Sequence, residues 1–389
     1  VSISDSGSLI IPGTTTISAV GMNVTFDDAS NNFGKIGVTG SNVSVLDSDG
    51  IDLGVSTVSG TFGITSGGAI TDSGTLAITG DATFTNTSGS NDAITLDDAS
   101  NAFAGTVTFA TDSGSAVTIV DTTALDLKAL SAASLSVTAG GAVTDSGTLA
   151  ISGATTLNSG SADITLDQSG STFGTLAITG ANVAVTENAA MDLGASTISG
   201  TASFNSTSNA ITDSGTLAIT GATTLNSGSA DLTLDDAAST FGALAITGAN
   251  VAVTENAAMD LGASTISGTA SFNSTSNAIT DSGTLAITGA TTLNSGSADL
   301  TLDQSASTFG TLAITGANVA VTENAAMDLG ASTISGTASF NSTSNAITDS
   351  GTLAITGATT LNSGSADITL NEAASTFGTL AITGTNVAV

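Results

Sequence analysis

A tandem repeat of 68 residues is the feature that most limits how this chain can fold. The segments 211–278 and 279–346 differ at only three positions, which are Asp236/Gln304, Ala237/Ser305 and Ala243/Thr311. Related copies occupy the rest of the chain, and together they span residues 3–69, 70–142, 143–210, 211–278, 279–346 and, incompletely, 347–389. Copies this similar must fold alike, so the chain is expected to be repetitive, with each unit packed on its neighbours.

Each copy contains a finer unit of 20 to 27 residues. Ile219, Ile246 and Ile266 each begin one such unit, because apolar residues recur six and thirteen residues after each of them. A period of this length is typical of a solenoid, whose coils bury their apolar side chains only by stacking. Three coils in each 68-residue copy are therefore expected.

Short strands are the secondary structure that the sequence favours. The runs LAIT, VAVT and DITL alternate apolar with small polar residues at period two, as β-strands do. Glycine or Ser-Gly interrupts every window long enough for an amphipathic helix. The sequence predicts an all-β fold, a parallel β-helix (β-solenoid) of about 17 coils. We expect one continuous solenoid over residues 1–389, a segment of a longer repeat protein because both ends lie inside copies.

Three short motifs are expected to shape the coils. Gly221, two residues after Ile219, is predicted to turn a corner with a positive φ. The aspartate of each Asp-Ser-Gly motif, as at Asp213, is predicted to cap nearby backbone N–H groups in a turn. The Ser-Thr-Phe-Gly element at 239–242 lengthens one coil in three, and we interpret it as a fourth short strand or a bulge.

The charge balance argues against several partners. The chain has 33 acidic residues and two basic ones, Lys35 and Lys128, for a net charge of −31. Such a chain repels nucleic acid and anionic membrane surfaces, and it has no apolar run of 18 residues that would insert into a membrane. The absence of cysteine fits an extracellular protein that is stabilised by stacking rather than by disulfides.

Four aspartates form the candidate metal site. Asp231, Asp260 and Asp235 stand twelve, fourteen and sixteen residues after coil starts, and Asp236 follows the last of them. Even offsets should face solvent, because apolar residues occupy the odd ones. The aspartates would then form an acidic stripe on one outer face, where carboxylates and carbonyls of neighbouring coils offer oxygen ligands for calcium, the one cofactor considered. The alternative is a solvated charged face, and the D-x-D-x-D-G calcium loop is absent.

Catalysis is not expected. Cleavage of an acidic glycan requires one cluster of carboxylates with a histidine or another base, whereas this chain has no histidine and near-identical copies repeat every feature. An ice-binding surface is a further alternative, since hydroxyls recur one residue after each coil start, at Thr220, Thr247 and Ser267. Serine, asparagine and abundant acids interrupt these arrays.

The runs GTLAITGATTLNSGSADITL and GTLAITGANVAV resemble the repeat regions of filamentous-haemagglutinin-like exoproteins and of autotransporter passenger domains. The resemblance covers most of the chain and rests on composition and period rather than on a signature motif. It implies a right-handed parallel β-helix and a place outside a bacterial cell or on its surface.

We therefore predict a non-enzymatic structural protein of the bacterial cell surface or extracellular matrix, such as a biofilm matrix. It would be a rigid stalk, adhesin or filament subunit that acts through its length and its repeated lateral surface. Self-association, end to end or side by side, and contact with a host or neighbouring cell are the expected interactions. The alternatives are a calcium-binding surface-layer or matrix protein, and an ice-binding or glycan-active β-helix.

Overall fold

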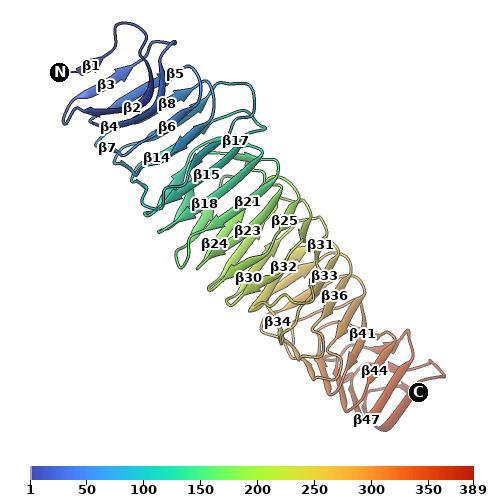
Figure 1. Ribbon diagram of the computed structural model, residues 1–389. Coiled ribbons are helices and arrows are strands. Elements are labelled where there is room, and N and C mark those ends of the chain that lie inside the picture. The colour runs from blue at the N-terminus through green and yellow to red at the C-terminus, as the bar shows by residue number, and fades with distance from the viewer. Residues whose placement is uncertain (1) are drawn as a thin grey trace. The chain divides into compact units, whose positions relative to one another are not determined.

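The computed structural model describes residues 2–389, and these residues form a parallel β-solenoid (Figure 1). They contain short strands joined by turns and no helix, so none of the described segments is a helix able to span a bilayer. The predicted fold class is confirmed, with about 19 turns instead of 17. The chain divides into a first compact unit that ends at Asp192 and a second, Leu193–Val389. That the two form one continuous domain stays a prediction.

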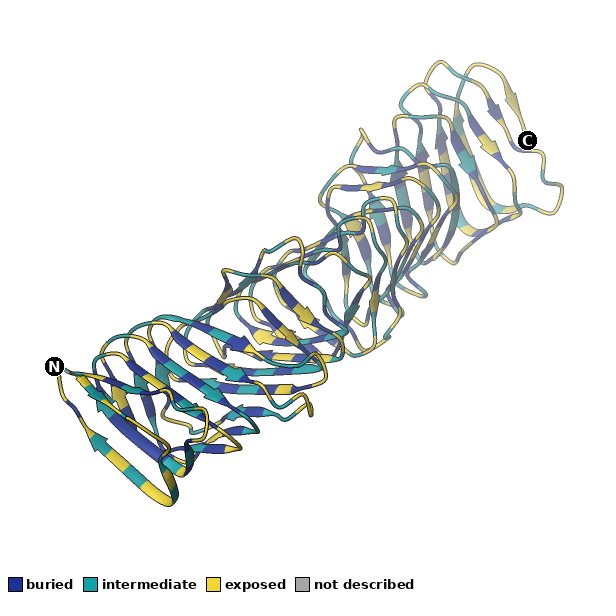
Figure 2. Ribbon diagram, turned by 90° about the horizontal axis from the view of Figure 1, so that it is seen from above, coloured by how far each residue is buried: buried dark blue, intermediate teal, exposed yellow. Residues whose placement is uncertain are grey.

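Alternation at period two explains why the strands form and which side chains they bury. In β31 (Leu232–Leu234) the two leucines are buried and Thr233 is half-exposed. In β33 (Val251–Thr254) the valines are buried and Ala252 between them is half-exposed. The same alternation appears in Figure 2 as buried and exposed bands along the strands. Buried residues of successive turns lie in columns, one of which contains Leu234, Val253, Phe272 and Leu293.

Strands of successive turns pair into ladders, and the second unit contains two long ones. The first long ladder consists of β28 (Ile211–Asp213), β31, β33, β36 (Ala270–Asn273), β39 (Thr291–Asn294), β41 (Thr311–Gly316), β43 (Met327–Leu329), β46 (Ile347–Asp349), β48 (Ile368–Thr369) and β50 (Val387–Ala388). The second long ladder consists of β34 (Met259–Leu261), β37 (Ile279–Asp281), β40 (Leu300–Leu302), β42 (Val319–Thr322), β45 (Ala338–Asn341), β47 (Leu353–Asn362) and β49 (Thr376–Thr383).

A short ladder ends within each repeat. One short ladder of the second unit consists of β26 (Ser196–Ile198), β29 (Leu217–Ile219) and a final isolated bridge between Ala218 and Thr240. Thr240 belongs to the Ser-Thr-Phe-Gly element, which forms this single bridge to an existing ladder and not a fourth short strand. No strand of the following turn continues the pairing at this place among the described residues.

The long strand β32 (Ala243–Gly248) turns one ladder into two. It pairs with β30 (Thr223–Asn226) on the preceding turn; on the following turn its start pairs with β34 and its end with β35 (Ser264–Ile266). Each repeat thus loses a ladder at Thr240 and gains one at β32. Seven successive pairings lead from β32 to β49, which contains the equivalent residues two repeats later, so one repeat makes three and a half turns.

The prediction of three coils per repeat is therefore wrong by half a turn. Ile219, Ile246 and Ile266 are not equivalent coil starts, because Ile219 pairs with Ile198, whereas Ile246 pairs with Leu225 and Ile266 with Gly248. The physical reason is the Ser-Thr-Phe-Gly element, which occupies the place of a strand although it lacks the alternation of one.

The predicted role of Gly221 is also wrong. The positive φ occurs at Gly228, at +59°, and not at Gly221. Gly221 is needed for another reason: a Cβ there would stand 2.4 Å from the carbonyl oxygen of Gly200 on the preceding turn. Such a contact is far inside van der Waals distance, so only glycine lets the two turns approach this closely.

Candidate functional site

A buried carboxyl group lies where each short ladder ends. Thr240 faces the preceding turn, because its N–H donates to Leu217 O at 2.8 Å and its O accepts Ile219 N–H at 2.9 Å. Backbone groups alternate in direction along a strand, so Phe241 N–H points toward the next turn, where this ladder has no strand. The side chain of Glu255 supplies the missing acceptor, and its Oε2 lies 3.1 Å from Phe241 N.

The side chain of Glu255 is fully buried, with an exposed fraction of 0%. Its Oε1 is also buried and has no hydrogen-bond partner among residues 2–389. Burial disfavours the charged form, which raises the pKa of Glu255 to about 8, and the bond from Phe241 N–H opposes this only in part. Glu323 accepts the N–H of Phe309, with 3.1 Å between Oε2 and N, and has the same raised pKa of about 8. These groups therefore hold a proton at neutral pH.

A strained loop contacts the backbone of Glu255. Thr275 has a φ of +47°, in the left-handed region that β-branched residues avoid. Its hydroxyl lies 3.0 Å from the carbonyl oxygen of Glu255 and 3.1 Å from Oδ1 of Asn256. The loop one turn later has Gly296 at the corresponding place, with a φ of +57°. The strained conformation thus holds the threonine hydroxyl against the backbone that carries the buried acid.

A second carboxylate ties successive turns together. Asp213 accepts the backbone N–H groups of Asp235, at 2.9 Å, and of Asp236, at 3.2 Å. The predicted capping role of the Asp-Ser-Gly aspartate is confirmed, although the N–H groups belong to the following turn rather than to its own. Burial raises the pKa of Asp213, and the two backbone bonds oppose that increase.

Two of the four predicted calcium ligands bind parts of the protein itself. Oδ1 of Asp231 accepts the backbone N–H and the side-chain amide of Asn250, at 3.1 and 2.9 Å. Oδ1 of Asp236 accepts Ala238 N–H at 2.8 Å, and its Oδ2 accepts the Thr216 hydroxyl at 2.9 Å. Both carboxylates thus have structural hydrogen bonds in place of a metal-directed arrangement.

The other two predicted ligands lie on different ladders. Asp235 directly follows β31 of the first long ladder, whereas Asp260 lies in β34 of the second. The half turn in each repeat separates them, so the expected single acidic stripe is not formed. No group of three or more Asp, Glu, His or Cys side chains suited to a metal ion occurs in residues 2–389. Calcium binding itself stays a prediction.

The sequence contains a signal for Glu255 that the acidic-stripe interpretation does not use. Val251, Val253 and Glu255 stand at alternate positions, and the two valines are buried. Period two therefore places the glutamate on the inner side. Its role as an acceptor for Phe241 N–H depends on the end of the short ladder, which no local pattern indicates.

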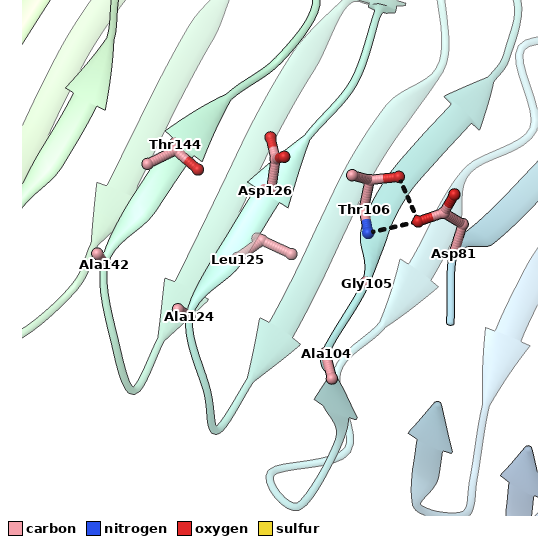
Figure 3. A pocket seen from close by; sticks show the side chains of 9 residues that line it. All are labelled: Asp81, Ala104, Gly105, Thr106, Ala124, Leu125, Asp126, Ala142 and Thr144. Carbon is pink, nitrogen blue, oxygen red and sulfur yellow. Dashed lines mark hydrogen bonds between the residues drawn. The ribbon is translucent and has the colours of Figure 1, made fainter. Parts of the chain in front are cut away.

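The first unit has a shallow groove of about 300 Å³ at the start of β14 (Thr106–Ala110) (Figure 3). Oδ1 of Asp81 accepts the N–H and the hydroxyl of Thr106 at 3.0 and 2.9 Å, and these bonds lower the pKa of Asp81. Asp126 lines the same groove from a later turn. At the equivalent place near β4 (Asn32–Gly40), Asp52 is the register partner of Lys35 and lies 3.8 Å from its ammonium group.

Comparison with known proteins places these features in a repeat family. The model of a family described as "Repeats of unknown function (DUF5649)" matches residues 1–39, 40–110, 114–179, 180–247, 248–315 and 316–384. The later matches have the period of the 68-residue repeat, so each of them spans about three and a half turns of this chain. No curated protein and no solved structure matches the chain.

Proposed function

The chain belongs to this family of repeats, and we propose that it is a non-enzymatic structural protein, a rigid spacer of the cell surface or the extracellular matrix. One observation carries the proposal: the second long ladder continues from β34 to β49 through successive near-identical copies. A solenoid of this kind gains length with each copy and needs no new type of contact. Stalk, adhesin and filament subunit are all forms of this function.

The side-chain chemistry supports a role without catalysis. The acids with a raised pKa occupy positions that recur from copy to copy and accept backbone N–H groups, as Glu255 does from Phe241 and Asp213 does from Asp235. An active site is a single place at which reacting groups converge on a substrate. Buried carboxyl groups that recur along the chain and accept backbone N–H groups stabilise the turns instead.

The basic residues support a place outside the cell. Trypsin-like proteases cut after lysine and arginine, and the chain offers only Lys35 and Lys128. Lys35 lies within β4 (Asn32–Gly40), where it forms an ion pair with Asp52. A spacer with so few accessible cleavage sites suits an environment that contains proteases.

Electron microscopy of the purified chain and of a variant that lacks residues 279–346 tests the proposal. The deletion joins Ala278 to Ile347 and so recreates the existing Ala278–Ile279 junction type. We expect elongated particles, shorter in the variant by three and a half turns, or ~17 Å at ~4.8 Å per turn. Globular particles, or particles whose length does not change, would refute the spacer function.

A further inference from the structure

Equivalent side chains of consecutive repeats lie on different ladders of the second unit. Thr292, in β39, belongs to the first long ladder. Its equivalent one repeat later, Thr360 in β47, belongs to the second long ladder. Its equivalent one repeat earlier, Thr224 in β30, pairs with β32, from which the second long ladder starts. Residues two repeats apart therefore share a continuous ladder, and residues one repeat apart do not.

An uncharged surface follows this alternation. The four adjacent strands β33, β36, β39 and β41 carry only Ala, Ser, Thr and Asn at their outward positions, which are exposed or half-buried. The central row of this surface contains Ala252, Ser271, Thr292 and Ala313. The same residue types recur 68 positions later on β42, β45, β47 and β49, in the second long ladder. In a chain with a net charge of −31, such a surface is distinctive.

We propose that the number of repeats sets the direction in which the lateral surface faces, as well as the length of the spacer. One repeat moves every later side chain to the other long ladder, and two repeats return it. The array thus displays its uncharged surface from two ladders in alternation. This inference rests on the spacer function, because direction matters only if the chain holds something in place.

The repeat sequence makes this device independent of copy number. Copies 211–278 and 279–346 are interchangeable at all but three positions, and their ladder pairings repeat in the same register. Nearest-neighbour contacts decide the stability of such an array. A change in copy number therefore preserves the core and changes only length and facing.

Cysteine pairs in the full chain test the half turn directly, since the native chain has no cysteine. Thr233 and Ala252 are register partners on adjacent turns, within the Cα separation that a disulfide allows. We expect T233C/A252C to form an intramolecular disulfide on oxidation. Three whole turns per repeat would instead pair Thr233 with Asp260, so a disulfide in T233C/D260C and none in T233C/A252C would overturn the inference.

Labels visible by electron microscopy test the facing. Biotin-maleimide and streptavidin on T224C/T360C should appear on the same side of each particle, and those on T224C/T292C on different sides. Deleting residues 279–346 should move the two labels of T224C/T360C to different sides. Deleting residues 143–210, a segment of equal length outside the labelled span, should leave them on one side.

The same images separate this inference from the spacer function. If particle length falls with each deletion but the labels stay on one side, the spacer function stands and the facing inference is wrong. If the particles are not elongated, the spacer function itself fails, whatever the labels show.

Discussion

The divergent copies of residues 3–142 and the near-identical copies that follow satisfy the same backbone group with different acids. Phe103 N–H donates to Asp121 at 3.2 Å, whereas Phe241 N–H donates to Glu255 at 3.1 Å. The shorter aspartate also accepts Thr123 N–H at 2.9 Å. Both acids leave one buried oxygen without a hydrogen-bond partner among the described residues, Oδ2 of Asp121 and Oε1 of Glu255. The constant requirement is an acceptor at the ladder end, and the acid itself is interchangeable.

The aspartates and the glutamates at this position differ in pKa. Burial raises the pKa of Asp47 to about 6, and backbone bonds from Phe33 and Asp49 oppose the shift. Burial raises the pKa of Glu255 to about 8, with one opposing bond. The near-identical copies therefore carry the more strongly protonated group, which places more of their stability under the control of pH.

The cores of the two regions also differ. Phe84 contacts Phe62, Phe103 and Phe109 with ring centroids 5.9, 6.1 and 5.8 Å apart. In the second unit Phe272 stacks between Val253 and Leu293. The divergent copies use an aromatic cluster where the later copies alternate aromatic and aliphatic residues.

The largest effect should come from this cluster. Phe84→Ala should cost more stability than Phe272→Ala, because each removes about 3–5 kcal/mol of packing and Phe84 also loses ring contacts worth about 0.5–1.5 kcal/mol per pair. Urea unfolding followed by circular dichroism measures both. Phe84→Leu and Phe272→Leu serve as controls that remove the ring and keep a large apolar side chain. Equal losses in the two alanine variants would contradict the comparison.

The next effect is a loss of stability as pH rises. The folded pKa of Glu255, about 8, lies above its ordinary value of 4.5, so the folded chain keeps a proton that the unfolded chain releases. Stability should be full below about pH 4.5, fall between about 4.5 and 8, and level off above about 8. The melting temperature across this range measures it, and the loss should be on the order of a few kcal/mol per buried glutamate.

Replacing the buried acids separates this effect from general charge repulsion. The triple variant E187Q/E255Q/E323Q keeps an acceptor for the phenylalanine N–H groups and cannot ionise, so its melting temperature should vary much less between about pH 4.5 and 8. Asp235→Asn, at an exposed position, removes one surface charge and should leave the pH dependence in place. A triple variant with the pH dependence of the native chain would rule out the buried glutamates as its source.

A smaller effect should appear at two glycines of the same loop type. Gly160 and Gly296 have φ values of +60° and +57°. A Cβ at Gly160 would meet nothing within 4 Å, whereas a Cβ at Gly296 would stand 2.4 Å from Ser276 Oγ. Gly160→Ala should therefore cost about 1–2 kcal/mol for the left-handed conformation alone, and Gly296→Ala should cost more. If thermal melting shows equal losses, contact with the strained loop does not matter.

The smallest effect should come from a natural difference between two copies. Thr311 Oγ1 donates to Asp328 at 2.8 Å, but the equivalent of Thr311 one repeat earlier is Ala243, opposite Asp260. Thr175, at the same position of an earlier copy, likewise donates to Oδ2 of Asp192 at 3.0 Å. Ala243→Thr should stabilise the chain by about 0.5–1.5 kcal/mol, and Thr311→Ala should destabilise it by a similar amount. Differential scanning calorimetry of both variants checks the two signs.

The sequence predicts the strands better than the ladders. Leu232–Leu234 and the inward position of Phe272 follow from period two alone. The half turn does not, because Thr240 joins the coil through a single bridge to Ala218 and has no alternating neighbours. Which turn lies beside which is decided by tertiary packing, and the error in turn count carried over to the aspartates, which were expected on a single face.

The buried glutamates also change how the chain behaves in an electric field. Glu187, Glu255 and Glu323 each have a pKa of about 8, so near neutrality most of their ionisable oxygens carry no charge. The folded chain then carries fewer negative charges than the formal net charge of −31, and its electrophoretic mobility should be lower than that value predicts. Titration with base should reveal extra buffering near pH 8, a range in which ordinary carboxylates have none.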